Sequence, residues 1–563
     1  MTEQAVRAIR PAMTPAILAK LFQDRTWRLS RTAVSVVIAG FAAVAALVCA
    51  ARAWNTLNPF IANDLSTVAY ARYADNLLRY PLSATRGLMA NLVGDTPAPF
   101  VAGTSPTFYS DHPSGLIWVT AVLERAFVAD PVIAVRLTGI LASIGTGAAL
   151  LAFVCQRVTV LPALGTIAVL STLNLFWEHA VVGQFEQITA FFMVGAVIAF
   201  LAYLRRPTGA RLAAAALLWA AGMLCDWPAY LLGAPFAIAL LARRWWGTLA
   251  FFTALGAVTM AVVFGHLILA GAGISITRFF YGTFHDVMKK TPYLGTLPPI
   301  VSLIVRAFWW WALFLVLPFA TLVRRAAPSR DMRELRFVFL AFMFAGLANE
   351  LLFNQWAQEH SFWSYYLIPA VCVGAAMTLQ WLHDVPVRPG AAAGALHAGI
   401  AVLFLAGAAS SGRHTAIFLR SHFYSPKTVA DMLDEHGVRD LLDRDAVILV
   451  APYCREPRLL GGDDGRALNC DIYSFAGALA RYALDRPALL ASDVDPPKIA
   501  CEKTFIVVRS PETVRKLTRL GMKPIAIFRF QWNVLRLSQL GRDYCADPTR
   551  IFVDADRMGN ASN

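Results

Sequence analysis

The aspartate at position 64 is placed where a side chain could do acid–base chemistry. It directly precedes a stretch whose apolar residues recur at helical spacing, namely Leu65, Val68, Ala69, Tyr73 and Leu77. An aspartate before a helix commonly caps it by accepting backbone N–H bonds. The same carboxylate could take a proton from an incoming hydroxyl or amine, as a general base does. The sequence leaves both roles open for Asp64.

A second polar motif runs from Phe108 to Gly115 and contains Asp111, His112 and Pro113. Proline is favoured in the first turn of a helix, so the His-Pro pair could mark only a helix boundary. The motif lies in the same interval between hydrophobic segments as Asp64. This shared position makes Asp111 and His112 candidates for substrate binding.

Four histidines have acidic neighbours and fall outside the hydrophobic segments: His112, His179, His285 and His360. Metal sites have recognisable ligand spacings, and none of these histidines shows one. We therefore predict that no metal or other cofactor is required, with a divalent metal as the alternative. One further histidine and four cysteines lie within hydrophobic segments and are predicted to be packing residues: His266, Cys49, Cys155, Cys225 and Cys372.

The polar motifs interrupt a strongly hydrophobic chain. Of its 563 residues, 57% are hydrophobic and 15% charged, and the mean hydropathy is +0.54. A soluble protein could not cover so much apolar side chain with polar surface. Runs of about 20 apolar residues predict a polytopic α-helical membrane protein with about eleven spans, at 32–51, 132–154, 160–178, 187–204, 212–226, 228–242, 248–270, 300–323, 335–353, 363–382 and 392–410.

The formal net charge is +14, which in a soluble protein would suggest nucleic-acid binding. Most of the basic residues, however, form short clusters beside hydrophobic segments, and the chain contains no recognisable nucleic-acid-binding module. Membrane proteins place such clusters on the cytoplasmic side. We therefore expect no nucleic-acid partner, and we predict that the basic segment 1–31 is cytoplasmic and leads into an uncleaved anchor span.

The predicted spans put the other basic clusters on the cytoplasmic side: Arg157, the pairs at 205–206 and 243–244, and the run from Arg324 to Arg336. This agreement requires that the apolar stretch 113–128 does not cross the membrane. The stretch is short for a span and contains Glu124 and Arg125. We predict that it is an interfacial helix, inside a long outer loop 1 (54–130) of a transmembrane domain that covers residues 32–411.

After Gly412 the pattern changes to strands and helices, which predicts a small extracytoplasmic α/β domain over residues 412–563. Strands are expected at 446–451, 504–508 and 525–530, with a helix at 511–520. The domain contains four cysteines, Cys454, Cys470, Cys501 and Cys545. They could form two disulfides on the oxidising side of the membrane, and their pairing stays open.

The order of these features resembles the GT-C glycosyltransferases, in particular the branch of protein O-mannosyltransferases and lipid A aminoarabinose transferases. The likeness covers roughly residues 32–410 in layout. It rests on Asp64 at the head of an amphipathic helix with Ala69-Tyr70-Ala71, a loop ending in Tyr109-x-x-His112-Pro113, Val135-Arg136-Leu137 at the next span, and the late Tyr365-Tyr366-Leu367-Ile368-Pro369.

This resemblance implies an inverting transfer of a sugar from a polyprenyl-phosphate carrier to an extracytoplasmic glycan, lipid or protein. It implies that Asp64 is the catalytic carboxylate and that Glu186, or else Glu178, is a second acidic residue. The chain departs from the family at three places, Asp64-Leu65, Pro113-Ser114-Gly115 and Asp226-Trp227-Pro228, where Asp-Glu, Pro-Pro-Leu and a Lys-Gly signal are usual. These departures affect the assignment of donor and acceptor more than the fold.

A lipid phosphate is a good leaving group, so the transfer needs a base for the acceptor and cations for the departing phosphate. Besides Asp111 and His112, the candidate substrate ligands are Arg72, Arg278, His285, Lys289, Lys290 and His360. The cations among them could equally contact anionic lipid headgroups. Membrane lipids are therefore expected partners in either case.

Two other functions stay open, a secondary transporter and a non-catalytic scaffold for envelope assembly. Transport is the commoner function of many-span proteins, but the spans show no obvious inverted repeat or paired broken helices. Strongly polar residues also concentrate in the outer loops rather than in the middle of spans. The layout favours the enzyme and a bacterial inner (cell) membrane, with the C-terminal domain outside.

Overall fold

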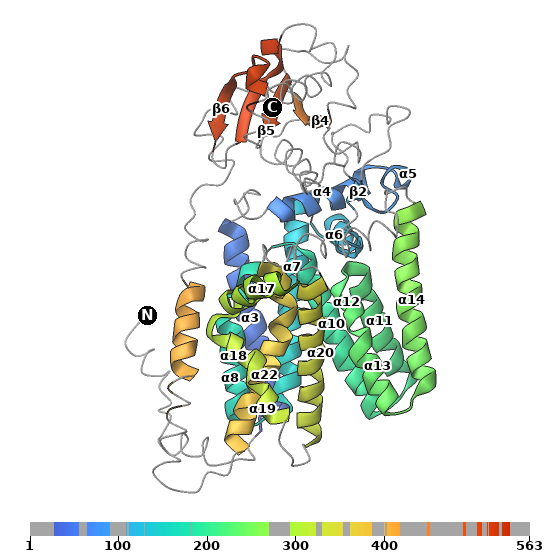
Figure 1. Cartoon of the computed structure of the whole chain (residues 1–563), viewed down its shortest axis with the longest axis vertical. Helices are drawn as coiled ribbons and strands as arrows, with labels where there is room; N and C mark the ends of the chain where they lie inside the picture. Colours follow the sequence, from blue (N-terminus) through green and yellow to red (C-terminus); the bar gives the residue numbers. More distant parts are fainter. Residues whose placement is uncertain are drawn as a thin grey trace.

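In the computed structural model, long apolar helices form a bundle (Figure 1). The structure describes residues 28–55, 65–90, 108–109, 112–128, 130–180, 182–269, 293–322, 329–352, 361–384, 399, 402, 404–416, 447–450, 488–490, 504–508, 515, 517–528 and 532–540.

Within these residues, seven helices are long and apolar enough to cross a membrane: Arg31–Ala50, Pro131–Cys155, Phe185–Arg205, Trp246–Leu269, Leu297–Leu322, Arg330–Leu352 and Phe362–Asp384. Three shorter apolar helices cover Val160–Thr172, Gly209–Cys225 and Pro228–Ala242. Large apolar side chains on their outer faces, such as Leu47 (71% exposed) and Leu217 (71%), would be accommodated by lipid. The chain is a multi-pass α-helical membrane protein. The last predicted span, 392–410, is described only in part, and residues 404–416 are helical.

The helices of the bundle, in chain order, are α3 (Arg31–Asn55), α7 (Pro131–Cys155), α8 (Val160–Thr172), α9 (Asn174–His179), α10 (Phe185–Arg205), α11 (Gly209–Cys225), α12 (Pro228–Leu231), α13 (Gly233–Ala242), α14 (Trp246–Leu269), α17 (Tyr293–Phe308), η2 (Trp309–Ala312), α18 (Leu313–Val316), α19 (Pro318–Leu322), α20 (Arg330–Leu352), η3 (Ser361–Leu367) and α22 (Ile368–Asp384). Buried side chains from most of them form one continuous core. The predicted packing cysteines, Cys49, Cys155, Cys225 and Cys372, are buried, as expected.

Several predicted spans are broken, although each is a continuous apolar run in the sequence. The run 160–178 divides into α8 and α9 at Leu173, whose backbone is extended. The run 300–323 divides into α17, η2, α18 and α19, and Trp309 has a positive φ of 51°. Hydropathy does not detect such breaks, because the broken segments are as apolar as the helices they join.

The residues of loop 1 form a layer of short elements across one end of the bundle. This layer contains α4 (Leu65–Arg79), α5 (Leu82–Thr85), the pair β1 (Met89–Ala90) and β2 (Phe108–Tyr109), and α6 (Gly115–Ala126). Figure 1 shows α4 lying across the end of the bundle, with α6 beside it and seen nearly end-on. The stretch 113–128 therefore lies at the end of the bundle instead of spanning it, as its charges and length predicted.

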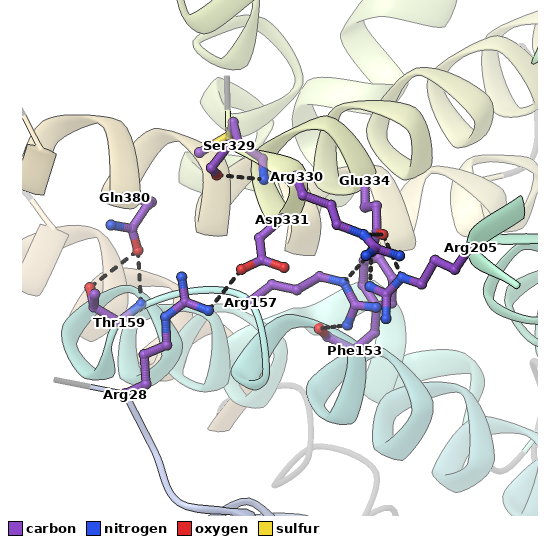
Figure 2. Close-up of polar contacts among 11 residues, drawn as sticks. Arg28, Phe153, Arg157, Thr159, Arg205, Ser329, Arg330, Asp331, Glu334 and Gln380 are labelled. Atoms are coloured by element: carbon purple, nitrogen blue, oxygen red, sulfur yellow. Dashed lines mark hydrogen bonds and ion pairs between the residues drawn. The ribbon is translucent and has the colours of Figure 1, made fainter. Parts of the chain in front are cut away.

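A cluster of charged side chains lies at the opposite end of the bundle (Figure 2). Arg157, just after α7, donates from Nε to Oε2 of Glu334 at the start of α20, at 2.9 Å. Arg205, the last residue of α10, donates from Nε to Oε1 of the same carboxylate at 2.5 Å, and Arg330 lies 3.4 Å from it. One buried glutamate thus joins the ends of three helices.

Two further contacts add helices to this end. Arg28, before α3, pairs with Asp331 of α20 at 2.7 Å (Figure 2). The backbone N–H of Thr159 donates to the side-chain oxygen of Gln380 near the end of α22, at 2.8 Å. Basic residues predicted to share one side of the membrane therefore do share one end of the bundle, which we call the arginine end. The loop-1 layer lies at the other end.

The C-terminal residues described by the structure form a five-stranded sheet of order β4-β3-β5-β7-β6. The strands are β3 (Val447–Val450), β4 (Ala488–Leu490), β5 (Thr504–Val508), β6 (Pro524–Phe528) and β7 (Trp532–Arg536), followed by η10 (Leu537–Leu540). β3 is parallel to β4 and β5, and β7 is antiparallel to β5 and β6. The three predicted strands are confirmed, whereas β4 and β7 were not predicted. The cysteines Cys454, Cys470, Cys501 and Cys545 lie outside the described residues.

Candidate active site

His112 lies where the loop-1 layer meets the bundle. Its Nδ1 is 2.7 Å from Oδ1 of Asp226, and in this pair the imidazole N–H donates to the carboxylate oxygen. The imidazole stacks on the ring of Phe185 at the start of α10, with centroids 4.5 Å apart and planes at 11°. A hydrogen bond in the ring plane and a stacked ring on one face together fix the orientation of His112.

Gly115 explains how the chain brings His112 to Asp226. A Cβ at this position would lie 2.4 Å from the carbonyl oxygen of Leu224, near the end of α11. Only a glycine allows the start of α6 to approach that backbone so closely. The contact places the residues just before α6 beside the residues just after α11.

Asp226 is the centre of the hydrogen-bonded cluster. It is the residue after α11 and is 2% exposed. Besides His112, it accepts a hydrogen bond from the hydroxyl of Tyr366 at 2.5 Å and one from the backbone N–H of Trp227 at 2.8 Å. These three donors offset the cost of burying a carboxylate. The carboxylate is consequently held in one orientation.

The 3-10 segment η3 ties this cluster to the rest of the bundle. Its 3-10 geometry lets consecutive side chains point toward different helices. The bonds are Ser364 Oγ to Glu350 of α20 (2.6 Å), Tyr365 OH with Ser143 of α7 (3.2 Å) and Tyr366 OH to Asp226 (2.5 Å). The Tyr-Tyr motif of the sequence therefore serves the site directly.

Glu186, the second residue of α10, is the other acidic side chain of the cluster. It is 5% exposed and lies close enough to interact electrostatically with both Asp226 and His112. Its Oε2 has no hydrogen-bond partner among the residues that the structure describes. A buried carboxylate oxygen in this state is available to a further hydrogen-bond donor, such as a substrate hydroxyl. Glu178, the alternative to Glu186, instead accepts a bond from Asn174 at 3.4 Å.

The first turns of α4 lie beside the start of α10. The hydroxyl of Thr67 accepts a hydrogen bond from the backbone N–H of Gly183 at 3.1 Å. One turn later, Tyr70 packs edge-on against Phe185 with centroids 4.8 Å apart. The helix that follows Asp64 in the sequence thus begins next to Glu186 and His112.

The structure describes only part of the predicted site. It brings together Glu186 and His112, and it places Arg72 in α4, 2% exposed, so that this arginine does not face lipid headgroups. Seven predicted residues lie outside the described residues: Asp64, Asp111, Arg278, His285, Lys289, Lys290 and His360. Among the described residues, no group of three or more His, Cys, Asp or Glu side chains could hold a metal ion.

Two residues of the cluster were not predicted as site residues, Asp226 and Tyr366. Asp226 appeared in the sequence only as a departure from the family pattern. An ionisable residue between two apolar runs is itself a signal of function in a membrane protein, and it could have identified this position.

No protein-family model and no curated protein matches the sequence. Solved structures do match. The crystal structure of ArnT, the lipid A aminoarabinose transferase, from Cupriavidus metallidurans bound to undecaprenyl phosphate aligns with a TM-score of 0.54 and 15% identity, over 91% of this chain and 100% of that one. The apo structure of the same protein aligns with a TM-score of 0.52 and 15% identity, over 88% and 97%.

The chain has the GT-C fold. The predicted fold class is therefore confirmed over nearly the whole length. An oligosaccharyltransferase from Archaeoglobus fulgidus, in complex with zinc and sulfate, also aligns, with a TM-score of 0.41 and 13% identity over 80% of this chain and 62% of that one. In the GT-C fold of this chain, the His112–Asp226–Tyr366 cluster lies where the loop-1 layer joins the bundle.

Proposed function

We propose that the protein is a membrane glycosyltransferase that moves a sugar from a polyprenyl-phosphate donor to an extracytoplasmic acceptor. The observation that carries this proposal is the gathering of Glu186, Asp226 and His112 at one end of a GT-C bundle, beside the helix that follows Asp64. The solved ArnT structure bound to undecaprenyl phosphate supports the donor class.

The proposed reaction inverts the anomeric carbon. The acceptor oxygen or nitrogen attacks that carbon on the side opposite the phosphate, the bond to the phosphate oxygen breaks, and Asp64 takes the proton of the acceptor. The lipid phosphate leaves with its electron pair and needs no general acid. Glu186 would accept hydrogen bonds from sugar hydroxyls through its unpartnered Oε2.

Cationic and donor groups of the outer loops would stabilise the departing phosphate. His112 and Arg72 are the described candidates, and Arg72 is buried in α4. The further candidate ligands, from loops outside the described residues, are Asp111, Arg278, His285, Lys289, Lys290 and His360. The scheme uses no metal or other cofactor.

The proposed site faces the extracytoplasmic side of a bacterial inner membrane. The arginine end would be cytoplasmic, because basic residues are retained on that side. The loop-1 layer and the C-terminal domain would then lie outside, where a polyprenyl-phosphate sugar and an envelope acceptor could meet.

The test is transfer by the purified protein in proteoliposomes that contain undecaprenyl-phosphate-linked sugars and candidate glycan, lipid or protein acceptors. We expect Asp64→Asn to lose about 10²-fold or more of turnover, the contribution of a general base, while still binding undecaprenyl phosphate. Asp331→Asn, the same chemical change at the arginine end, serves as the matched control. Full turnover by Asp64→Asn would remove Asp64 from the mechanism. Sugar translocation without transfer would replace the enzyme by a transporter.

A further inference from the structure

We infer that Asp226 is a positioning residue of the site, which holds His112 of loop 1 and Tyr366 of η3 in their working orientations. The expected effect of Asp226 on the rate of transfer rests on the proposed function. The expected effect on the orientation of His112 and Tyr366 rests only on the geometry of the described residues. Nothing in the family pattern provides for an acidic residue here, because the chain departs from that pattern at Asp226.

The carboxylate of Asp226 is itself fixed. It is 2% exposed and follows directly on α11, whose last turn is packed against Gly115. Its Oδ1 also accepts the backbone N–H of Trp227 at 2.8 Å, which locks the side chain against its own backbone. A fixed acceptor can orient whatever donates to it.

Asp226 fixes the rotation of the His112 ring within its own plane. Stacking on Phe185 sets the plane of the imidazole but leaves rotation within the plane free. The 2.7 Å bond from Nδ1 to Asp226 removes that rotation. Because the acceptor holds Nδ1 as the donor, it also sets the direction and tautomer of Nε2. The side chain of His112 keeps 15% exposure, so a ligand can reach the ring.

The same carboxylate reaches the opposite side of the site through Oδ2, which accepts the Tyr366 hydroxyl at 2.5 Å. Asp226 thus links a side chain of loop 1 to one that lies nearly half the chain further along the sequence. Other titratable groups near it are Glu186 of α10 and Cys225 of α11. Loss of Asp226 would release two oriented side chains at once.

A purely structural role predicts a different outcome from a positioning role. If Asp226 only stabilised the fold, its loss and the loss of His112 would add independently in their effects on transfer. If Asp226 acts through His112 as well as Tyr366, then Asp226→Asn costs less once His112 is gone, because only the Tyr366 contact is left to lose. Residues in one hydrogen-bonded network show this kind of non-additivity.

The kinetic experiment is a double-mutant cycle on transfer in proteoliposomes, with Asp226→Asn, His112→Gln and the double variant. We expect Asp226→Asn to lower kcat about 30-fold with the donor KM within about twofold, and the loss in the double variant to be clearly smaller than the product of the two single losses. Asp331→Asn should behave as the wild type. Additive losses in the cycle would overturn the positioning role while leaving the glycosyltransferase in place.

A second experiment needs no transfer activity, so it separates this inference from the proposed function. Diethyl pyrocarbonate modifies accessible imidazoles, and the rate at His112 is read by mass spectrometry of the full-length protein. We expect that rate to rise about fivefold in Asp226→Asn and to stay unchanged in Asp331→Asn. The rates at His266 and His414 should not change, which shows that the fold is intact. An unchanged rate at His112 would overturn the inference even in a protein that transfers nothing.

Discussion

Replacing Glu334 by glutamine tests whether the charge cluster stabilises the arginine end. The side chain of Glu334 is 9% exposed and that of Arg157 is 8% exposed, whereas those of Arg205 and Arg330 are 34% and 60% exposed. Removing one partner of a buried ion pair costs about 3–5 kcal/mol, because the other charge stays buried without compensation. Exposed pairs contribute only about 0–1 kcal/mol.

Only Arg157 therefore contributes strongly to the expected cost. Arg205 and Arg330 can turn toward water after the substitution. Arg157 keeps a hydrogen bond to the carbonyl oxygen of Phe153 at 2.6 Å and a contact with the ring of Phe153 at 3.7 Å. These retained contacts place the expected loss for Glu334→Gln at the lower end of the range, at about 3 kcal/mol.

Thermal unfolding of the purified protein in detergent measures this loss. A change of 1 kcal/mol shifts the melting temperature by about 2–4 °C in domains of about 150–250 residues, and by about half of that in a domain of this size, so we expect a decrease of about 3–6 °C. Arg330→Gln is the matched control and should cost less than about 1 kcal/mol. The double variant Arg157→Met/Glu334→Met should recover much of the loss. A melting temperature for Glu334→Gln equal to that of Arg330→Gln would refute the reasoning.

Two more predictions concern the loop-1 layer, and a third concerns the membrane topology. Burial, followed by the charge and hydrogen bond of Asp75, raises the pKa of Glu124 in α6 from 4.5 to about 8. The folded state therefore binds the proton more tightly than the unfolded state, and stability falls as the pH rises between these two values. The melting temperature of the wild type should fall relative to that of Glu124→Gln between about pH 5 and 9, and parallel curves would contradict this. Gly115→Ala should displace α6 from α11 and lower both the melting temperature and transfer, because its Cβ would meet the Leu224 carbonyl at 2.4 Å; wild-type values would show that the close approach is not needed. A cysteine at exposed Arg125 should react with a membrane-impermeant thiol reagent from outside, and one at exposed Arg206 only after permeabilisation; the reverse pattern would invert the topology.

The sequence predicted the layout of the fold because hydropathy and charge are properties of whole segments. Arg28, Arg157, Arg205 and Arg330 were predicted to share a side, and they do lie at one end of the bundle. The same counting kept the stretch 113–128 out of the membrane, and α6 lies at the end of the bundle. The breaks at Leu173 and Trp309 could not be predicted, since they depend on tertiary packing and not on local composition.

The sequence singled out residues of the candidate site only where one segment carries its own signal. The His-Pro pair identified His112, and the family resemblance pointed to Glu186. Their convergence on Asp226 depends on the approach of α6 to α11, which is a contact between segments far apart in the sequence. Tyr366 was noticed as part of a motif, but its partner could be found only in three dimensions.

The two ends of the bundle differ in the number of hydrogen bonds that their buried glutamates make. At the arginine end, Glu334 holds three helices with several strong bonds at once. At the loop-1 end, Glu186 and Asn349 keep buried side-chain atoms without partners among the described residues. Moving the side chain of Glu186 to admit a substrate would therefore break fewer hydrogen bonds than moving that of Glu334, whose carboxylate would have to leave several donors at once.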